Sequence, residues 1–278
     1  MTHIGRSRLR RSVDAITVAV VCLVMLFPIL WGLSTSLKAR DKILEYPPRF
    51  VPDSPTLEHY RLLLETGIGQ FVLNSTIVSV STVLVCLFLG SLAGYALARY
   101  TFHGKGLVMF IILAVMSIPL PSLMVPTYTF VSRLGLLETR AGLALLYTAY
   151  QLPITVWILY GFFETIPPEL ERAAMIDGYT RVQALRKVVM PLSRPGLVAA
   201  GLFVLTFAWN DFVVALVMTS SNEVRTLPVG IYNYLGFYGR EWGPLTASAM
   251  VSIVPIVIVF IIFQRFFLSG MTGGSVKG

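Results

Sequence analysis

One acidic residue, Asp211, stands inside a long apolar stretch of this sequence, directly after Trp209 and Asn210. A charged side chain inside a bilayer is costly unless it is paired or hydrated, so a residue of this kind is a candidate for function. An aromatic ring can stack on the apolar face of a sugar, while amide and carboxylate groups bind its hydroxyls. These three residues therefore indicate a path for a polar solute. The alternative is that Asp211 faces a neighbouring helix for structural reasons.

The sequence contains no other set of residues suited to catalysis or to metal binding. The histidines, His3, His59 and His103, lie far apart, and we expect each to be solvated or interfacial. Cys22 and Cys86 occupy separate apolar runs without a CxxC spacing. The phosphate-binding pattern G-x-x-x-x-G-K-[ST] does not occur. We therefore expect no metal, no cofactor and no enzymatic activity, and the energy for any transport must come from a partner or from an ion gradient.

The composition indicates an integral membrane protein made only of helices. Of 278 residues, 55% are hydrophobic and 13% are charged, about half the charged share of a soluble domain. Six apolar stretches are each long enough to cross a bilayer, which takes about 17 to 25 residues. They are 15–37, 71–98, 107–132, 141–163, 196–222 and 242–264. We expect one transmembrane domain over residues 1–278, with six spans and prolines that bend several of them.

The basic residues predict the orientation of these spans. Thirteen of the 22 lysines and arginines fall in the segments that lie inside if the N-terminus is inside, over a similar total length to the outside segments. This bias favours both termini in the cytoplasm. Residues 38–70 then form an outside loop, in which a short helix, 57–65, is expected to begin after Thr56 and to end at Gly67.

The inside segment 164–195, which we call loop 164–195, is expected to form a helix–turn–helix. Pro167 and Pro168 suit the start of its first helix, because proline in the first turn gives up only an amide that has no partner. Gly178 suits the left-handed residue that ends a helix. Thr180 and Gln183 have the spacing of a capping box at the start of the second helix.

The second helix of loop 164–195 is expected to run to about Met190 and to stop at Pro191. In the first helix, Ala173 and Ala174 are small, so a partner could approach the backbone closely there. The pattern alone leaves a docking site and an amphipathic helix pair on the inner membrane face equally open.

The order of residues in loop 164–195 resembles the Glu-Ala-Ala loop of binding-protein-dependent ABC importer permeases. The similar segments are Glu171-Arg-Ala-Ala-Met-Ile-Asp-Gly178 and Val188-Val-Met-Pro191. Arg172 departs from the family, which usually has glutamate there, so Glu169 or Glu171 is left to supply an acidic contact. The resemblance implies that this loop contacts an ATPase. The residues it points to are Glu169, Glu171, Ala173, Ala174, Asp177, Gly178 and Pro191.

Four further segments are similar to the second permease subunit of maltose-type carbohydrate importers. They are Phe207–Phe212, Arg225–Pro228, Trp242–Leu245 and the tail Gln264–Gly278. The resemblance implies a type I importer fold in the inner membrane. It also implies a homologous second permease, a cytoplasmic ATPase dimer, an extracytoplasmic binding protein and a sugar or oligosaccharide as the solute. Within this class, glycerol phosphate or a polyol is the alternative solute.

Two other classes of protein fit the sequence less well than an importer permease does. An ion-coupled secondary transporter would use Asp211 for a proton or sodium ion, but the sequence has no internal repeat of the six-span unit. An intramembrane hydrolase would need a nucleophile with a base, or a metal pair, inside the spans. No histidine lies in the six apolar stretches, and no second acid accompanies Asp211.

Overall fold

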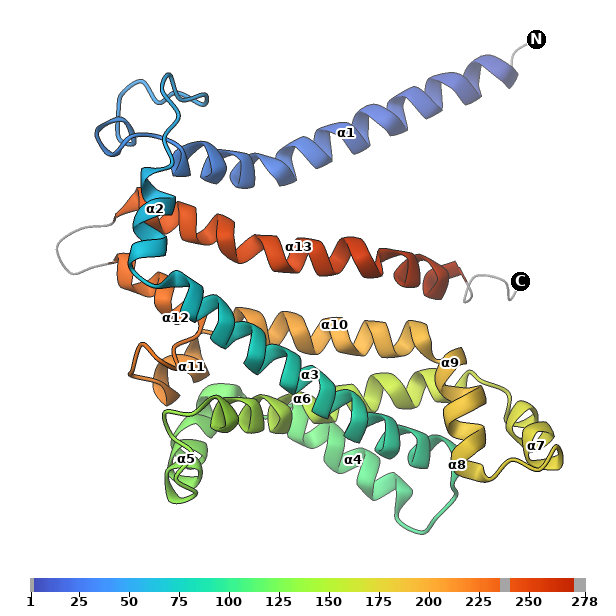
Figure 1. The fold of residues 1–278 in the computed structure, drawn as a ribbon. Coiled ribbons are helices and arrows are strands. Elements are labelled where there is room, and N and C mark those ends of the chain that lie inside the picture. Colours follow the sequence, from blue (N-terminus) through green and yellow to red (C-terminus); the bar gives the residue numbers. More distant parts are fainter. Residues whose placement is uncertain (1–2, 236–240, 273–278) are drawn as a thin grey trace. The chain divides into compact units, whose positions relative to one another are not determined.

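The computed structural model describes residues 3–235 and 241–272, with side chains for 13–235 and 241–264. Every regular element in these ranges is helical, as Figure 1 shows. The α-helices are α1 His3–Ser36, α2 Glu58–Glu65, α3 Ile68–Arg99, α4 Lys105–Met116, α5 Leu120–Arg133, α6 Arg140–Glu164, α7 Pro168–Ile176, α8 Arg181–Ala184, α9 Met190–Leu192, α10 Arg194–Asn210, α11 Val213–Met218, α12 Leu227–Tyr232 and α13 Trp242–Thr272. Of the predicted tail, residues 273–278 lie outside the described ranges.

Four of the six apolar stretches form single helices long and apolar enough to cross a membrane, α1, α3, α6 and α13. The count reaches six if each of two bent helix pairs is taken as one span. The all-helical membrane fold expected from the composition is therefore confirmed, although two of the expected spans are not straight helices.

The third expected span, 107–132, is broken between α4 and α5, whose axes differ by 98°. Pro119 has an extended backbone with ψ of 129° and stands directly before α5. Neither Pro119 nor Pro121, the second residue of α5, has an amide hydrogen. Neither can therefore donate the backbone hydrogen bond that would continue α4. The prolines thus separate two helices, where the sequence analysis expected only a bend.

The fifth expected span, 196–222, is also not one helix. Helix α10 ends at Asn210, and Asp211 takes an extended conformation with ψ of 125° before the short helix α11 begins. The apolar run continues through this break, which is why hydropathy alone did not reveal it.

The chain forms two compact units, and the first contains residues 1–68 with 231–254. Here α2 begins one residue later than predicted, and the Thr56 hydroxyl accepts a hydrogen bond from the Glu58 amide at 3.1 Å. Gly67 is left-handed, with φ of 82°, as expected. The prediction for His59 was wrong. It is 2% exposed and donates from Nε2 to the Lys38 carbonyl at 2.9 Å, with its ring over Gly243.

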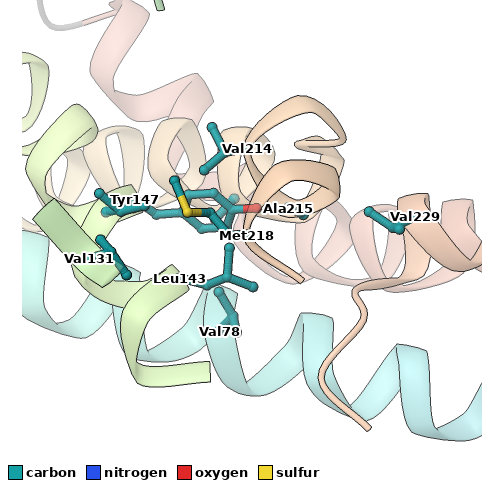
Figure 2. Close-up of a cluster of buried hydrophobic side chains, with 10 residues drawn as sticks. Val78, Val131, Leu143, Tyr147, Val214, Ala215, Met218 and Val229 are labelled. Atoms are coloured by element: carbon teal, nitrogen blue, oxygen red, sulfur yellow. The ribbon is translucent and has the colours of Figure 1, made fainter. Parts of the chain in front are cut away.

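The second unit contains residues 69–230 with 255–278 and holds the larger core. Figure 2 shows one buried cluster, in which side chains from α3, α5, α6, α11 and α12 meet. Its labelled members are Val78, Val131, Leu143, Tyr147, Val214, Ala215, Met218 and Val229. A second cluster gathers Tyr95, Leu159, Phe163, Ile166, Val189 and Ala200. This cluster lies where α3, α6 and α10 meet loop 164–195.

Helices α3 and α6 approach each other closely because two glycines on α3 face α6. A Cβ atom on Gly90 would lie 2.6 Å from Thr155 Cγ2, and one on Gly94 would lie 3.0 Å from the Tyr160 backbone nitrogen. Spaced four residues apart, they form the small-residue pattern that brings helix backbones together in membranes. The sequence analysis did not use this pattern.

Candidate functional site

Loop 164–195 folds as a helix–turn–helix, with the local chemistry that the sequence predicted. Pro168 is the first residue of α7, and Gly178 follows the helix with φ of 91°. At the start of α8 the Thr180 hydroxyl accepts from the Gln183 amide at 3.3 Å, and the Gln183 side chain accepts from the Thr180 amide at 2.8 Å. The capping box is thus confirmed.

The end of the second helix differs from the prediction. The chain does not leave the helix before Pro191, but passes through a π-helical turn, Leu185–Val189, into α9 and then α10. Pro191 has no amide hydrogen, so the carbonyl four residues before it loses its α-helical donor. The wider π turn in that region keeps the chain helical up to the proline, which stands in the first turn of α9.

One side of α7 faces into the protein. Glu171 and Ala174 are buried, whereas Glu169, Arg172 and Ala173 are exposed. Helix α7 packs against α8 and the π turn, and Ala174 is buried. Its small size suits packing within the chain, and its approach by a partner stays a prediction. Ala173 is the alanine that a partner could reach.

The Glu171 carboxylate has a partner within the chain. Its Oε1 lies 3.3 Å from Arg99 Nε, and both side chains are 9% exposed. Arg99 also donates from Nη2 to the Ile166 carbonyl at 2.9 Å. By contrast, Glu169 pairs with Arg172, at 3.8 Å and in solvent. If an acidic residue of α7 is to meet another protein, Glu169 has the exposure to do so.

Two strongly exposed apolar residues flank the turn of loop 164–195. Ile176 is 86% exposed and Val182 is 73% exposed, and between them Asp177, Gly178 and Tyr179 are exposed as well. Neither Ile176 nor Val182 was singled out from the sequence. The sequence could have revealed them, because an amphipathic helix in water carries polar residues on the face that does not pack against a core.

Asp211 forms a tie between α6 and α11. Its Oδ2 accepts from the Tyr147 hydroxyl at 2.8 Å and from the Ala215 amide at 3.0 Å. Tyr147 is fully buried, and its ring packs edge-on against Phe207 at 5.8 Å. Tyr147 was not predicted from the sequence, since it lies 64 positions away in an apolar stretch. The structural role left open for Asp211 therefore has direct support in this geometry.

The neighbours of Asp211 are placed differently from each other. Trp209 is only 3% exposed, so its ring is not available to stack on a sugar in this conformation, because it lies inside the protein. Asn210 is exposed and donates from Nδ2 to the Thr206 carbonyl at 2.8 Å. Of the three residues predicted to line a solute path, Asn210 is exposed and Asp211 is half-buried, and their contact with a solute stays a prediction.

Asn210 lines a groove of about 530 Å³ between α10 and the second half of α13. Thr206 and Asn210 supply its polar groups, and the remaining lining is apolar. The apolar lining residues are Ala199, Leu202, Phe203, Leu205, Phe207, Ile256, Val259 and Phe260. An apolar wall with two polar groups at one end can hold a molecule with both polar and apolar faces.

A polar network near the N-terminal end of α3 holds the segment between α11 and α12 in place. The buried Asn74 donates from Nδ2 to the carbonyls of Glu223 at 2.9 Å and Arg225 at 2.8 Å. Its Oδ1 accepts from Arg140 Nε at 2.8 Å and from the Gln70 side chain at 3.0 Å. This network could not be recognised from neighbouring residues in the sequence, since Asn74 and Arg225, for example, are 151 positions apart.

Glu138 holds the same segment from a second side. Its carboxylate accepts from the backbone amides of Ser220 at 2.6 Å and Ser221 at 3.1 Å. Partial burial raises the pKa of this carboxyl. The hydrogen bonds from Ser221 and Ser220 outweigh that effect and leave the pKa below its ordinary value. The segment is therefore held by a carboxylate that stays ionised near neutral pH.

Helices long and apolar enough to cross a bilayer, two of the expected spans broken, and a helical loop with an apolar tip define a membrane protein with several spans. Within the described residues, no three His, Cys, Asp or Glu side chains come together in a group that could hold a metal ion. Comparison with known proteins identifies the family. The chain belongs to the family of binding-protein-dependent transport system inner membrane components, whose model matches residues 86–273.

Two curated relatives are similar over nearly the whole chain. One is the sulfoquinovosyl glycerol transport system permease protein of Agrobacterium fabrum. It is 40% identical over 254 residues, which are 91% of this chain and 89% of the relative. The other is the trehalose/maltose transport system permease protein of Thermococcus litoralis. It is 34% identical over 275 residues, which are 98% of this chain and 97% of the relative.

A solved structure shares the fold. It is a chain of a bacterial ABC transporter involved in the import of the acidic polysaccharide alginate. It matches with a TM-score of 0.81 at 23% identity and covers 94% of this chain and 98% of that chain. The resemblance stated from the sequence is confirmed, and the chain is a permease component of a binding-protein-dependent transport system.

Proposed function

We propose that this chain forms half of the translocation path of an ATP-driven importer for a sugar or oligosaccharide. The two curated relatives transport sulfoquinovosyl glycerol and trehalose or maltose, according to their names. These solutes share a glycosidic, hydroxyl-rich chemistry. A homologous second permease would complete the path, and an extracytoplasmic binding protein would deliver the solute. Residues 13–30 of α1 are all exposed within this chain, which suits contact with lipid or with that second permease.

We propose further that loop 164–195 is the coupling loop, which meets one subunit of a cytoplasmic ATPase dimer. The observation that carries this proposal is the exposed apolar pair Ile176 and Val182 at the turn. Apolar side chains outside the membrane are stabilised by a dry partner surface. Ala173, Asp177 and Gly178 would share the contact. The buried Glu171 and Ala174, together with Pro191, would shape the loop from within.

Replacing Ile176 by glutamate is expected to release the ATPase. The side chain is exposed, so the change costs little inside this chain, but it would place a charge in an apolar interface. Loss of a central contact weakens binding by about ten-fold or more. The measurement is the amount of ATPase that co-purifies with the tagged permease complex. Val51→Glu is the matched control, since Val51 is also apolar and exposed but lies in the 38–70 loop. Equal ATPase recovery in both variants would contradict the proposed contact.

We propose that both termini are cytoplasmic, since the coupling loop must lie on the side of the ATPase and the basic residues favour the same orientation. A cysteine introduced at the exposed position of Arg186 is expected to react with a membrane-impermeant maleimide only after the cells are opened. A cysteine at Val51 should react in intact cells. Labelling in the reverse order would contradict this topology.

We propose that Asn210 and Asp211 line the solute path and that Trp209 supports them through packing. The solute itself can be tested on the partner binding protein. We expect mono- and oligosaccharides to raise its melting temperature, whereas glycerol phosphate and simple polyols should not.

A further inference from the structure

We infer that the buried ion pair between Arg99 and Glu171 positions loop 164–195 on the end of α3, so that movement of the loop is passed to that helix. The inference rests on the proposed coupling role of the loop. It gives Glu171 a partner inside this chain in place of a contact with the ATPase, and it makes Arg99, which the sequence analysis did not select, a positioning residue.

A single guanidinium joins three segments of the chain. Arg99 is the last residue of α3, Ile166 lies in the link between α6 and α7, and Glu171 is in the first turn of α7. Arg99 Nε faces Glu171 Oε1 at 3.3 Å, and Nη2 donates to the Ile166 carbonyl at 2.9 Å. Arginine suits this position because its planar group can direct several donors at once.

The depth of the pair sets it apart from the other acidic side chain of α7. Arg99 and Glu171 are each 9% exposed, so removal of either one leaves an uncompensated charge away from water. The Glu169–Arg172 pair on the same helix is exposed, and exposed pairs contribute little. Of the two acidic residues in the first turn of α7, Glu171 is therefore the one able to hold the loop in place.

The second helix of the loop reaches the same end of α3. The Arg181 guanidinium, from α8, lies over the ring of Tyr100 at 5.0 Å. Tyr100 directly follows Arg99, so both helices of loop 164–195 contact consecutive residues at the end of α3. This second contact is independent of the ion pair and points to the same junction.

Movement at Arg99 can be transmitted along α3 to the helix that packs closely against it, α6. Five residues before Arg99, Gly94 lets α3 meet the backbone of α6 at Tyr160, without side chains in between that could deform. Close-packed interiors have low compressibility and transmit strain, so we expect two helices in direct contact to move together. The junction would therefore move α3 and α6 together when the loop moves.

The test uses the complete transporter in proteoliposomes and measures solute taken up per ATP hydrolysed. Arg99→Gln and Glu171→Gln each remove one charge of the pair, and the double variant R99E/E171R restores opposite charges in reversed order. We expect each single change to lower this ratio by about ten-fold, within the range of coupling free energies between sites. The double variant should recover most of it. Arg40→Gln is the matched control, because Arg40 forms an exposed pair with Glu241 at 3.2 Å.

Each outcome decides the matter. A lowered ratio in both single variants with recovery in the double variant, and none of this in Arg40→Gln, supports the inference. A normal ratio in either single variant overturns it, as does failure of the double variant to recover either the ratio or the membrane level. Loss of ATPase binding in Glu171→Gln but not in Arg99→Gln also overturns it, since Glu171 would then contact the ATPase directly. If the unaltered chain binds no ATPase, the proposed function itself fails.

Discussion

Replacing Gly178 by valine is expected to abolish solute uptake while the protein still inserts into the membrane. The residue has φ of 91°, and among the described residues a Cβ atom there would meet nothing within 4 Å beyond its chain neighbours. The obstacle is therefore conformational and not steric crowding. A left-handed conformation costs a residue with a side chain about 1 kcal/mol or more, and a β-branched residue is strongly disfavoured there. The turn would have to open, which would change the angle between α7 and α8.

Asparagine is the matched control at this position, because it adopts the left-handed conformation more readily than other residues with side chains. Membrane level, ATPase co-purification and uptake should be measured together in Gly178→Val and Gly178→Asn. We expect the asparagine variant to retain most of its uptake and the valine variant to lose it, with equal membrane levels. Normal uptake and a normally bound ATPase in Gly178→Val would defeat the coupling role of the turn.

Loop 164–195 could be predicted from the sequence wherever its structure depends on neighbours in the chain. Proline at the first turn of α7, the left-handed glycine after it, and the capping box at Thr180 all act within four residues of the position they fix. The π turn before Pro191 was beyond this reasoning. A missing amide can end a helix or widen one turn of it, and packing of the surrounding helices decides which occurs.

Burial within the loop could not be predicted, because it depends on segments far away in the sequence. Glu171 is turned inward by Arg99, which lies 72 positions earlier. For the same reason, a tryptophan at Ala174 would separate α7 from its neighbours inside the loop, and would test packing, not docking. His59 follows the same rule, since the glycine beneath its ring comes from α13.

Asp211 was selected from the sequence for its unusual position, and the structure shows hydrogen bonds of its carboxylate that the sequence did not reveal. The sequence marked Asp211 because an acid in an apolar stretch requires a reason. The structure supplies one reason within the chain, since the carboxylate joins the buried Tyr147 hydroxyl to the first turn of α11. A tie of this kind does not exclude contact with a solute, because Asp211 is half-buried and its neighbour Asn210 opens onto the groove between α10 and α13.

Two substitutions of Asp211 should separate the tie from solute contact. Asp211→Ala removes the acceptor of the Tyr147 hydroxyl and the Ala215 amide, which leaves buried donors unsatisfied at a cost of about 1–3 kcal/mol each. We expect a lower melting temperature in detergent and reduced uptake. Asp211→Asn keeps an oxygen for both donors and removes only the negative charge. We therefore expect it to melt close to the unaltered protein and still to take up solute more slowly.

Tyr147→Phe is the matched control for the hydrogen bond between Tyr147 and Asp211, because it removes the hydroxyl but keeps the ring against Phe207. It should lower the melting temperature without changing the solute concentration that gives half-maximal uptake. Unchanged uptake kinetics in Asp211→Asn would show that the carboxylate charge has no part in the solute path and that Asp211 serves only to join α6 to α11.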